Sequence, residues 1–264
     1  MILVLGGTLE GREIASTLAG QNHEVLITVV SGYGAEMIPE NSGVEVLVGQ
    51  LDGKDLERLI TEREVRLIVD ATHPYAWVIT ETAWETANLR GIPYIRYERP
   101  AVLTDQKDGV YRVASYEKAA ELAASLGNTI FLTIGSKNIA SFVKRTRDLS
   151  KRVVARVLPD PRVLDQCLAA GLGSRNVIAV QGPFSFEMNL AMFREYKADV
   201  LVTKDSGQTG GADTKVKAAA HLEIPVIVIE RPNTRGMPMT DSIPEILAQA
   251  GKLRYQSDWG SIPR

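Results

Sequence analysis

The feature that most limits how this sequence can fold is a regular alternation of short apolar runs with longer segments of helical spacing. We expect strands at the short runs, which are rich in Val, Ile and Leu and end in turn residues: 1–7, 23–32, 43–51, 65–74, 92–100, 128–136, 152–159, 176–183, 198–207 and 224–232. Helices are expected between them, at 9–22, 51–63, 79–91, 139–149, 161–170, 185–196, 213–222 and 242–251. Strands and helices that alternate at this spacing predict an α/β fold with parallel sheets covered on both faces.

An internal repeat divides the chain into halves. The segment Ile92-Pro93-Tyr94-Ile95-Arg96-Tyr97-Glu98-Arg99-Pro100 has a close counterpart at 224–232, 132 residues later in a chain of 264. A related pair, VLGGT at 4–8 and LTIGS at 132–136, opens the two halves. We interpret this as two Rossmann-like parallel-sheet domains, 1–104 and 105–264, with a cleft between them. The alternative is that unrelated strands both begin with Ile-Pro by chance.

Composition excludes several classes of function. The chain has 30 Lys and Arg against 32 Asp and Glu, a net charge of −2, so it has no general basic field for nucleic acid or an anionic membrane. The single cysteine, Cys167, and three scattered histidines predict no disulfide and no metal site. No signal peptide is recognisable, and no apolar run reaches the roughly 18 residues of a membrane span. We therefore expect a soluble, cytoplasmic protein.

A glycine-rich turn follows the first predicted strand. Turns of this kind bind the pyrophosphate of dinucleotides, because backbone without Cβ lets phosphate approach the amide groups at the helix N-terminus. Here Thr8 replaces the middle glycine of the usual pattern, and its hydroxyl is a possible phosphate donor. The second strand ends in Ser31 without an acid, which slightly favours NADPH over NADH and leaves both possible. The candidate cofactor residues in these two segments are Gly6, Gly7, Thr8, Glu10, Gly11 and Ser31.

A second polar loop, Asp70-Ala71-Thr72-His73-Pro74-Tyr75-Ala76, follows a buried strand of the first half. Ligands of open α/β sheets lie at the carboxyl ends of the strands, where this loop projects. Thr72 and His73 are candidate cofactor residues, His73 and Tyr75 are candidate proton donors, and Tyr75 is also a candidate substrate contact. The alternative is a helix start with Thr72 as its cap, which explains neither His73 nor Tyr75.

The second half carries donors and positive charge at its strand ends. The segment 203–211 combines glycines with hydroxyl residues and is followed by Lys215, which suggests an anion site that is not a P-loop. A flexible solvated loop is the alternative. The candidate substrate residues of this half are Ser136, Lys137, Arg156, Gln181, Ser185, Lys204, Ser206, Gly210, Gly211 and Lys215, and Lys204 is a third candidate proton donor.

Taken in order along the chain, GGTLEGREIA, DATHPYA, YIRYERP, LTIGSKNI, ARVLP, QGPFS and LVTKDSG followed by IPVIVIERP resemble the precorrin-6A reductase family of cobalamin biosynthesis. The resemblance covers nearly the whole chain. It implies hydride transfer from NADPH or NADH to a double bond of a corrin precursor, with a proton added at the neighbouring carbon. The segment Ser31–Glu36 looks more like the cobalt-containing branch of the family.

The resemblance also implies the partners. The substrate would be a polycarboxylate tetrapyrrole bound by the second domain, and other enzymes of the cobalamin pathway are candidate partners. Many carboxylates need many charge-assisted hydrogen bonds, which agrees with the lysines and arginine at the strand ends of the second half. Two other functions remain as alternatives: a non-catalytic, dinucleotide-binding regulatory module, and a sugar-nucleotide or phosphoryl transferase, which the missing P-loop disfavours.

Overall fold

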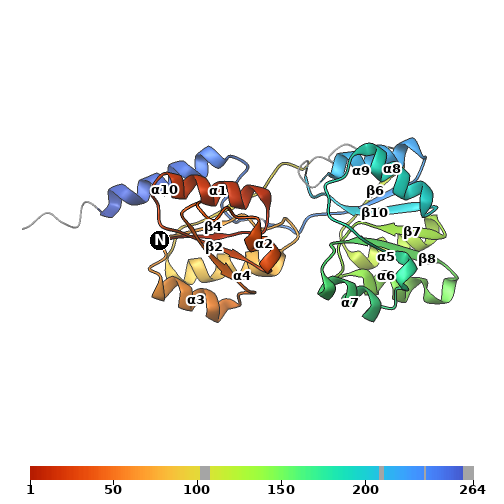
Figure 1. Cartoon of the computed structure of the whole chain (residues 1–264), viewed down its shortest axis with the longest axis horizontal. Helices are drawn as coiled ribbons and strands as arrows, with labels where there is room; N and C mark the ends of the chain where they lie inside the picture. The colour runs from red at the N-terminus through yellow and green to blue at the C-terminus, as the bar shows by residue number, and fades with distance from the viewer. Residues whose placement is uncertain (102–107, 208–210, 235, 258–264) are drawn as a thin grey trace, which may run out of the picture. The chain divides into compact units, whose positions relative to one another are not determined.

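The computed structural model describes residues 1–101, 108–207, 211–234 and 236–257, and it divides into two compact units (Figure 1). Unit 1 contains Met1–Pro100 together with Pro232–Arg264, and unit 2 contains Ala101–Arg231. Each unit is built on its own six-stranded sheet in which every pairing is parallel. The α/β class with two Rossmann-like parallel sheets is therefore confirmed.

The sheet of unit 1 has the strand order β12-β5-β4-β1-β2-β3, which is the order of a dinucleotide-binding Rossmann domain. Its strands are β1 (Ile2–Leu5), β2 (Val25–Val29), β3 (Val44–Val48), β4 (Leu67–Asp70), β5 (Tyr94–Tyr97) and β12 (Met239–Thr240). Its helices are α1 (Leu9–Gly20), α2 (Gly32–Glu36), α3 (Gly53–Glu62), α4 (Trp77–Arg90) and α10 (Ile243–Ser257). Helices α1 and α10 cover one face of the sheet, and α3 and α4 cover the other (Figure 1).

The sheet of unit 2 repeats this arrangement with the order β6-β11-β10-β7-β8-β9. Its strands are β6 (Val110–Val113), β7 (Thr129–Leu132), β8 (Arg152–Val157), β9 (Val177–Ala179), β10 (Val200–Lys204) and β11 (Val226–Ile229). Its helices are α5 (Tyr116–Leu126), α6 (Ile139–Thr146), α7 (Pro161–Ala169), α8 (Phe186–Glu195) and α9 (Ala212–His221), with 3-10 turns at Arg147–Leu149 and Ser174–Asn176. The side chains of α8 and α9 pack on one face, around Phe131 and Phe193.

The two units exchange their sixth strands. After β5 the chain leaves unit 1 and enters unit 2 as β6, which pairs with β11. After β11 it returns to unit 1 as β12, which pairs with β5. The repeated segments 92–100 and 224–232 contain the two strands, β5 and β11, from which the chain crosses over.

The exchange changes the expected domain boundaries. The second domain was expected to extend from 105 to 264, but the structure assigns the chain from Pro232 onward to unit 1. The reason is burial, since Ile246 and Ala250 of α10 are fully buried in the same apolar cluster as Ile14 and Leu18 of α1. The elements β6, α5, α2 and β12 were not expected from the sequence.

Within the described part of the chain, the structure contains no helix that is both long and apolar enough to cross a membrane.

Candidate functional site

Three glycines shape the turn between β1 and α1. A Cβ on Gly6 would lie 2.7 Å from the Ile27 side chain, so this turn has to press against β2. Gly7 has a φ of +107°, which side chains rarely adopt, and the space beside it is open. A Cβ on Gly11 would lie 3.3 Å from that of Ala71, so α1 packs tightly against the residue that follows β4. In a dinucleotide-binding turn, glycines likewise permit the tight turn, let the backbone approach the pyrophosphate, and let the helix pack closely on the sheet.

The side chains of Thr8 and Glu10, in the same region, form hydrogen bonds and an ion pair with other residues of unit 1. The Thr8 hydroxyl accepts a hydrogen bond from the Gly11 N–H at 3.0 Å and donates to the Ala71 carbonyl at 2.7 Å. Its one hydrogen is therefore used, and the expectation that it donates to phosphate is replaced by a role as the cap of α1. The Glu10 carboxylate, largely buried, lies 3.2 Å from the Arg99 guanidinium.

Ser31 begins α2 directly beyond β2. Its hydroxyl caps the helix by accepting from the Gly34 N–H at 3.3 Å. The residues from Val30 to Ala35 include no carboxylate, so the position that binds the adenosine ribose in NAD-specific domains has no acid here.

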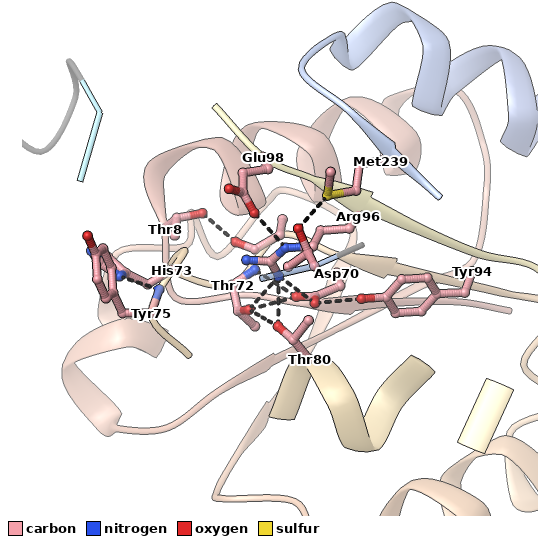
Figure 2. Close-up of polar contacts among 12 residues, drawn as sticks. Thr8, Asp70, Thr72, His73, Tyr75, Thr80, Tyr94, Arg96, Glu98 and Met239 are labelled. Carbon is pink, nitrogen blue, oxygen red and sulfur yellow. Dashed lines mark hydrogen bonds and ion pairs between the residues drawn. The ribbon is translucent and has the colours of Figure 1, made fainter. Parts of the chain in front are cut away.

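A buried polar network lies at the carboxyl ends of β4 and β5 (Figure 2). The guanidinium of Arg96 is 1% exposed, and its Nη1 donates to Asp70 Oδ2 at 2.6 Å and to Thr80 Oγ1 at 2.7 Å. Its Nε donates to Glu98 Oε2 at 2.9 Å. We call this set the Arg96 network; it comprises Asp70, Thr72, Thr80, Tyr94, Arg96 and Glu98.

The Arg96 network combines one guanidinium with two carboxylates. Burial opposes the charge of Arg96, but the carboxylates of Asp70 and Glu98 outweigh it and raise the pKa of the guanidinium. Burial and the neighbouring Asp70 raise the pKa of Tyr94, whose hydroxyl donates to Asp70 at 2.8 Å. The Arg96 guanidinium therefore stays protonated and the Tyr94 hydroxyl stays neutral at neutral pH.

The structure separates the residues of the loop that follows β4. Thr72 is buried, and its hydroxyl and its N–H both donate to Asp70 Oδ1, at 2.7 and 3.0 Å. The expectation that Thr72 contacts the cofactor through its side chain is therefore replaced by a place in the Arg96 network. His73 and Tyr75 are partly buried and lie together, away from Arg96 (Figure 2).

His73 is held in one tautomer. Its Nδ1 accepts a hydrogen bond from the Tyr75 N–H at 3.2 Å, so the proton of the neutral ring is on Nε2. Protonation of Nδ1 would break this bond, because two donors would then face each other.

Unit 2 contains an open pocket of about 310 Å³ at the carboxyl ends of its strands. Three of the expected substrate residues line it: Arg156, Gly211 and Lys215. The Arg156 guanidinium lies 4.3 Å from the centre of the Phe184 ring, and its Nη1 donates to Asn189 Oδ1 at 2.8 Å. The Phe184 ring and the Asn189 amide thus orient the Arg156 guanidinium, which lines the pocket.

Positive charges are crowded around this pocket. Burial lowers the pKa of Arg156 to about 10. Burial, and next the charge of Lys137, lower the pKa of Lys204 to about 8. Burial together with the charges of Arg156 and Lys204 lowers the pKa of Lys215 to about 7, although Asp205 opposes this. A bound anion would relieve this repulsion, so the cluster favours a ligand with several negative charges.

The remaining described candidates of unit 2, Lys204 among them, lie outside the lining of the pocket. The hydroxyl of Ser136 donates to Gln166 at 2.6 Å, and the hydroxyl of Ser185 caps α8. Lys137 and Gln181 are exposed, and Ser206 is buried. Gly210 lies outside the described residues.

Several residues that shape the two regions were not predicted from the sequence. In unit 1 these are Arg96 and Glu98, and in unit 2 they are Thr133 and Asn189. The available signal was a charged residue within an apolar strand, as at Arg96 between Ile95 and Tyr97, because such a residue needs a buried partner.

Comparisons with known proteins identify the family of the chain. Residues 1–250 match the family model described as "Precorrin-6x reductase CbiJ/CobK". The chain belongs to the precorrin-6x reductase family.

Relatives of this reductase support the assignment along its whole length. It is 36% identical over 258 residues to the cobalt-precorrin-6A reductase of Methanothermobacter thermautotrophicus, covering 96% of this chain and 84% of the relative. It is 40% identical over 233 residues to the cobalt-precorrin-6A reductase of Priestia megaterium, covering 88% and 91%. The solved structure of CobK precorrin-6A reductase, 23% identical, has the same fold with a TM-score of 0.74 over 100% of this chain and 98% of that one.

Membership in the family makes this protein an oxidoreductase that acts on a tetrapyrrole of cobalamin biosynthesis, and it implies a nicotinamide cofactor. A regulatory module without turnover is not favoured. The residues of unit 1 fit such a cofactor, because the strand order, the open positive-φ position at Gly7 and the tight contact at Gly11 are those of a dinucleotide site.

Proposed function

We propose that this reductase binds NADPH at the glycine turn of unit 1 and the carboxylates of cobalt-precorrin-6A at the pocket of unit 2. The observation that carries the second half of this proposal is the repulsion felt by Lys215, which lines the pocket together with Arg156, from the charges of Arg156 and Lys204. Buried positive charges whose pKa values are depressed are costly in the free protein, and a polycarboxylate ligand offsets that cost. The names of the two relatives support a cobalt-containing substrate.

The preference for NADPH rests on the end of β2. NAD-specific domains hold the ribose diol with a carboxylate at this position, and residues 30–35 supply none. A 2′-phosphate therefore meets no repulsion there. We expect a dissociation constant for NADPH at least tenfold lower than for NADH, and equal affinities would contradict the preference.

A nicotinamide cofactor held at the glycine turn would supply the hydride for one carbon of the ring double bond. The neighbouring carbon then needs a proton, and Lys204 is the best suited of the three candidate donors. Its pKa of about 8 leaves it mostly protonated at pH 7 yet acidic enough to donate. In the transfer an N–H bond of the ammonium group breaks, a C–H bond forms, and the neutral amine remains.

The direct test of the reaction is to mix the purified protein with NADPH or NADH and with metal-free or cobalt-loaded precorrin-6A. We expect the spectrum of the cobalt-loaded substrate to change with NADPH. A change with the metal-free substrate alone would reassign the substrate, and no change with any pair would reject the proposed reaction.

Gly7→Ala tests the cofactor site. A side chain at a φ of +107° is strained by roughly 1–3 kcal/mol, and its Cβ would occupy the open space beside the turn. We expect the affinity for NADPH, measured by calorimetry, to fall at least tenfold while the protein remains folded. The matched control is Gly20→Ala at the end of α1, where added Cβ meets nothing within 4 Å and no positive φ is required. Unchanged affinity in Gly7→Ala would remove the turn from the cofactor site.

Lys204→Arg tests the proton donor. Arginine keeps the positive charge for substrate carboxylates but does not release a proton at neutral pH. We expect kcat to fall at least a hundredfold while the KM for the tetrapyrrole stays within threefold. A rise in KM with normal kcat would instead make Lys204 a binding residue.

Location in the cytoplasm and contact with other enzymes of the cobalamin pathway remain predictions from the sequence.

A further inference from the structure

The Arg96 network brackets the loop 71–76 at both ends. At the start of the loop, the Thr72 N–H and hydroxyl donate to Asp70 Oδ1. Beyond its end, Thr80 in the first turns of α4 accepts from Arg96 Nη1 at 2.7 Å. One buried guanidinium therefore bonds to residues on either side of the segment that carries His73 and Tyr75 (Figure 2).

Helix α4 needs this support because it begins without a side-chain cap. Its N-cap is Ala76, which supplies no hydroxyl or carboxylate to the first N–H groups. The bond between Arg96 and Thr80 ties the start of the helix to β5. Loss of that bond releases the helix start, and with it the end of the loop.

The same strand end also bonds to the glycine turn. Arg99, three residues after Arg96, lies 3.2 Å from Glu10 in the first turn of α1. Across the site, the Thr8 hydroxyl donates to the carbonyl of Ala71, the first residue of the loop. The glycine turn and the loop 71–76 are thus held against each other directly, and both are held by the segment that ends β5.

Stability alone does not account for a network of this kind. Burying an arginine with two carboxylates costs desolvation free energy, and apolar side chains of similar volume often stabilise a core at least as well. What apolar side chains lack is a partner for the Thr72 N–H. We propose that the Arg96 network is a positioning device, which sets the loop 71–76, and through it His73 and Tyr75, against the cofactor turn. This inference rests on the proposed function of unit 1.

Thr80→Val tests the inference with the smallest change. Valine has nearly the same shape but removes one acceptor from Arg96 Nη1, which then has Asp70 and the more distant Thr72, at 3.3 Å. The matched control is Thr86→Val in the same helix, where the buried hydroxyl bonds only to the Thr82 carbonyl one turn earlier. Thr80→Ser restores the hydroxyl and is the rescue variant.

Two readouts separate positioning from stability. At equal fractions of folded protein, we expect kcat/KM for NADPH to fall about tenfold in Thr80→Val, to stay within twofold in Thr86→Val, and to recover in Thr80→Ser. Amide hydrogen exchange, which needs no cofactor, is expected to accelerate at Thr72, Tyr75 and Ala76 in Thr80→Val alone. These three N–H groups bond to Asp70 Oδ1, His73 Nδ1 and the His73 carbonyl.

The possible outcomes separate a failure of the proposed function from a failure of the positioning role. If wild type neither binds nor oxidises NADPH or NADH, the proposed function fails. If wild type is active and Thr80→Val matches Thr86→Val in both kinetics and exchange, the positioning role fails and the network only stabilises the fold. Faster exchange with unchanged kcat/KM also overturns the proposal, because the loop would then move without consequence for the cofactor.

Discussion

Arg96 and Arg156 are both buried, but their side chains have different partners and therefore different roles. Arg96 faces the carboxylates of Asp70 and Glu98, so its charge is neutralised and its N–H groups hold neighbouring segments in place. Arg156 bonds to the Asn189 amide and lies over the Phe184 ring, and within the described residues it has no carboxylate partner. Its charge therefore remains available to a ligand in the pocket.

Lys215 makes the stability of the protein depend on pH. Its pKa is about 7 in the folded protein, mainly because of burial, against 10.5 in the unfolded chain. Between these values the unfolded chain binds a proton that the folded protein does not, so this group makes stability rise with pH from 7 to about 10.5. Below pH 7 the full cost of burying the charge is present.

Lys215→Met should remove that cost. We expect the free energy of unfolding to increase by on the order of 3 kcal/mol at pH 6, and by less than about 1 kcal/mol at pH 10. Urea denaturation of both proteins at the two pH values measures the difference. Lys217→Met, on the exposed side of the same helix, is the control and should change stability little at either pH. A stabilisation of Lys215→Met that does not depend on pH would show that burial does not shift the titration of this lysine.

The sequence locates the candidate loops but not the bonds of their side chains. Glycine turns and polar loops that follow apolar strands lie at the carboxyl edge of their own parallel sheet, so Gly7 and His73 in unit 1 and Lys204 in unit 2 were identified as candidates from the sequence alone. Thr8 and Thr72 were assigned to the cofactor because a sequence does not show which acceptor a hydroxyl will meet. The acceptor of Thr8 is the carbonyl of Ala71, 63 residues away.

At the scale of elements, buried apolar strands were predictable, and the two exchanged edge strands, β6 and β12, were not. Every central strand is a buried apolar run, and each was expected from the sequence. The exchanged strands lack this signal, because β6 has two exposed residues among four and β12 has only two residues. Without them the crossover of the chain between the units was not visible, and α10 was assigned to the wrong domain.

Ile246→Ala tests the assignment of α10 to unit 1. Ile246 is fully buried against the cluster that includes Ile14 and Leu18, so its truncation should destabilise unit 1 by about 2–4 kcal/mol. Amide hydrogen exchange should accelerate in α1 and β5 and stay unchanged in the strands of unit 2. Ile139→Ala, an equally buried position in α6, should give the reverse pattern. Faster amide hydrogen exchange in the strands of unit 2 in Ile246→Ala would show that the assignment of α10 to unit 1 is wrong.

At the scale of the whole molecule, the exchange of strands makes the two units unequal. Unit 2 is a continuous stretch that contains all six of its strands, whereas unit 1 needs the chain from Pro232 onward for β12 and α10. The crossing segments are held within their own units, since Arg99 pairs with Glu10 and Arg231 donates to the Asp205 carbonyl at 2.9 Å. Either unit therefore has a complete sheet and a complete core of its own.

This asymmetry predicts how fragments behave. The fragment 101–231 should unfold cooperatively in urea, because no strand of its sheet is missing. The fragment 1–100 should not, since it exposes the apolar face of α1 that α10 covers. Joining 1–100 to 232–264 through a glycine-serine linker should restore a cooperative transition. If 101–231 fails to fold while the joined fragment succeeds, unit 2 depends on contacts with unit 1, and the division into two self-sufficient units is wrong.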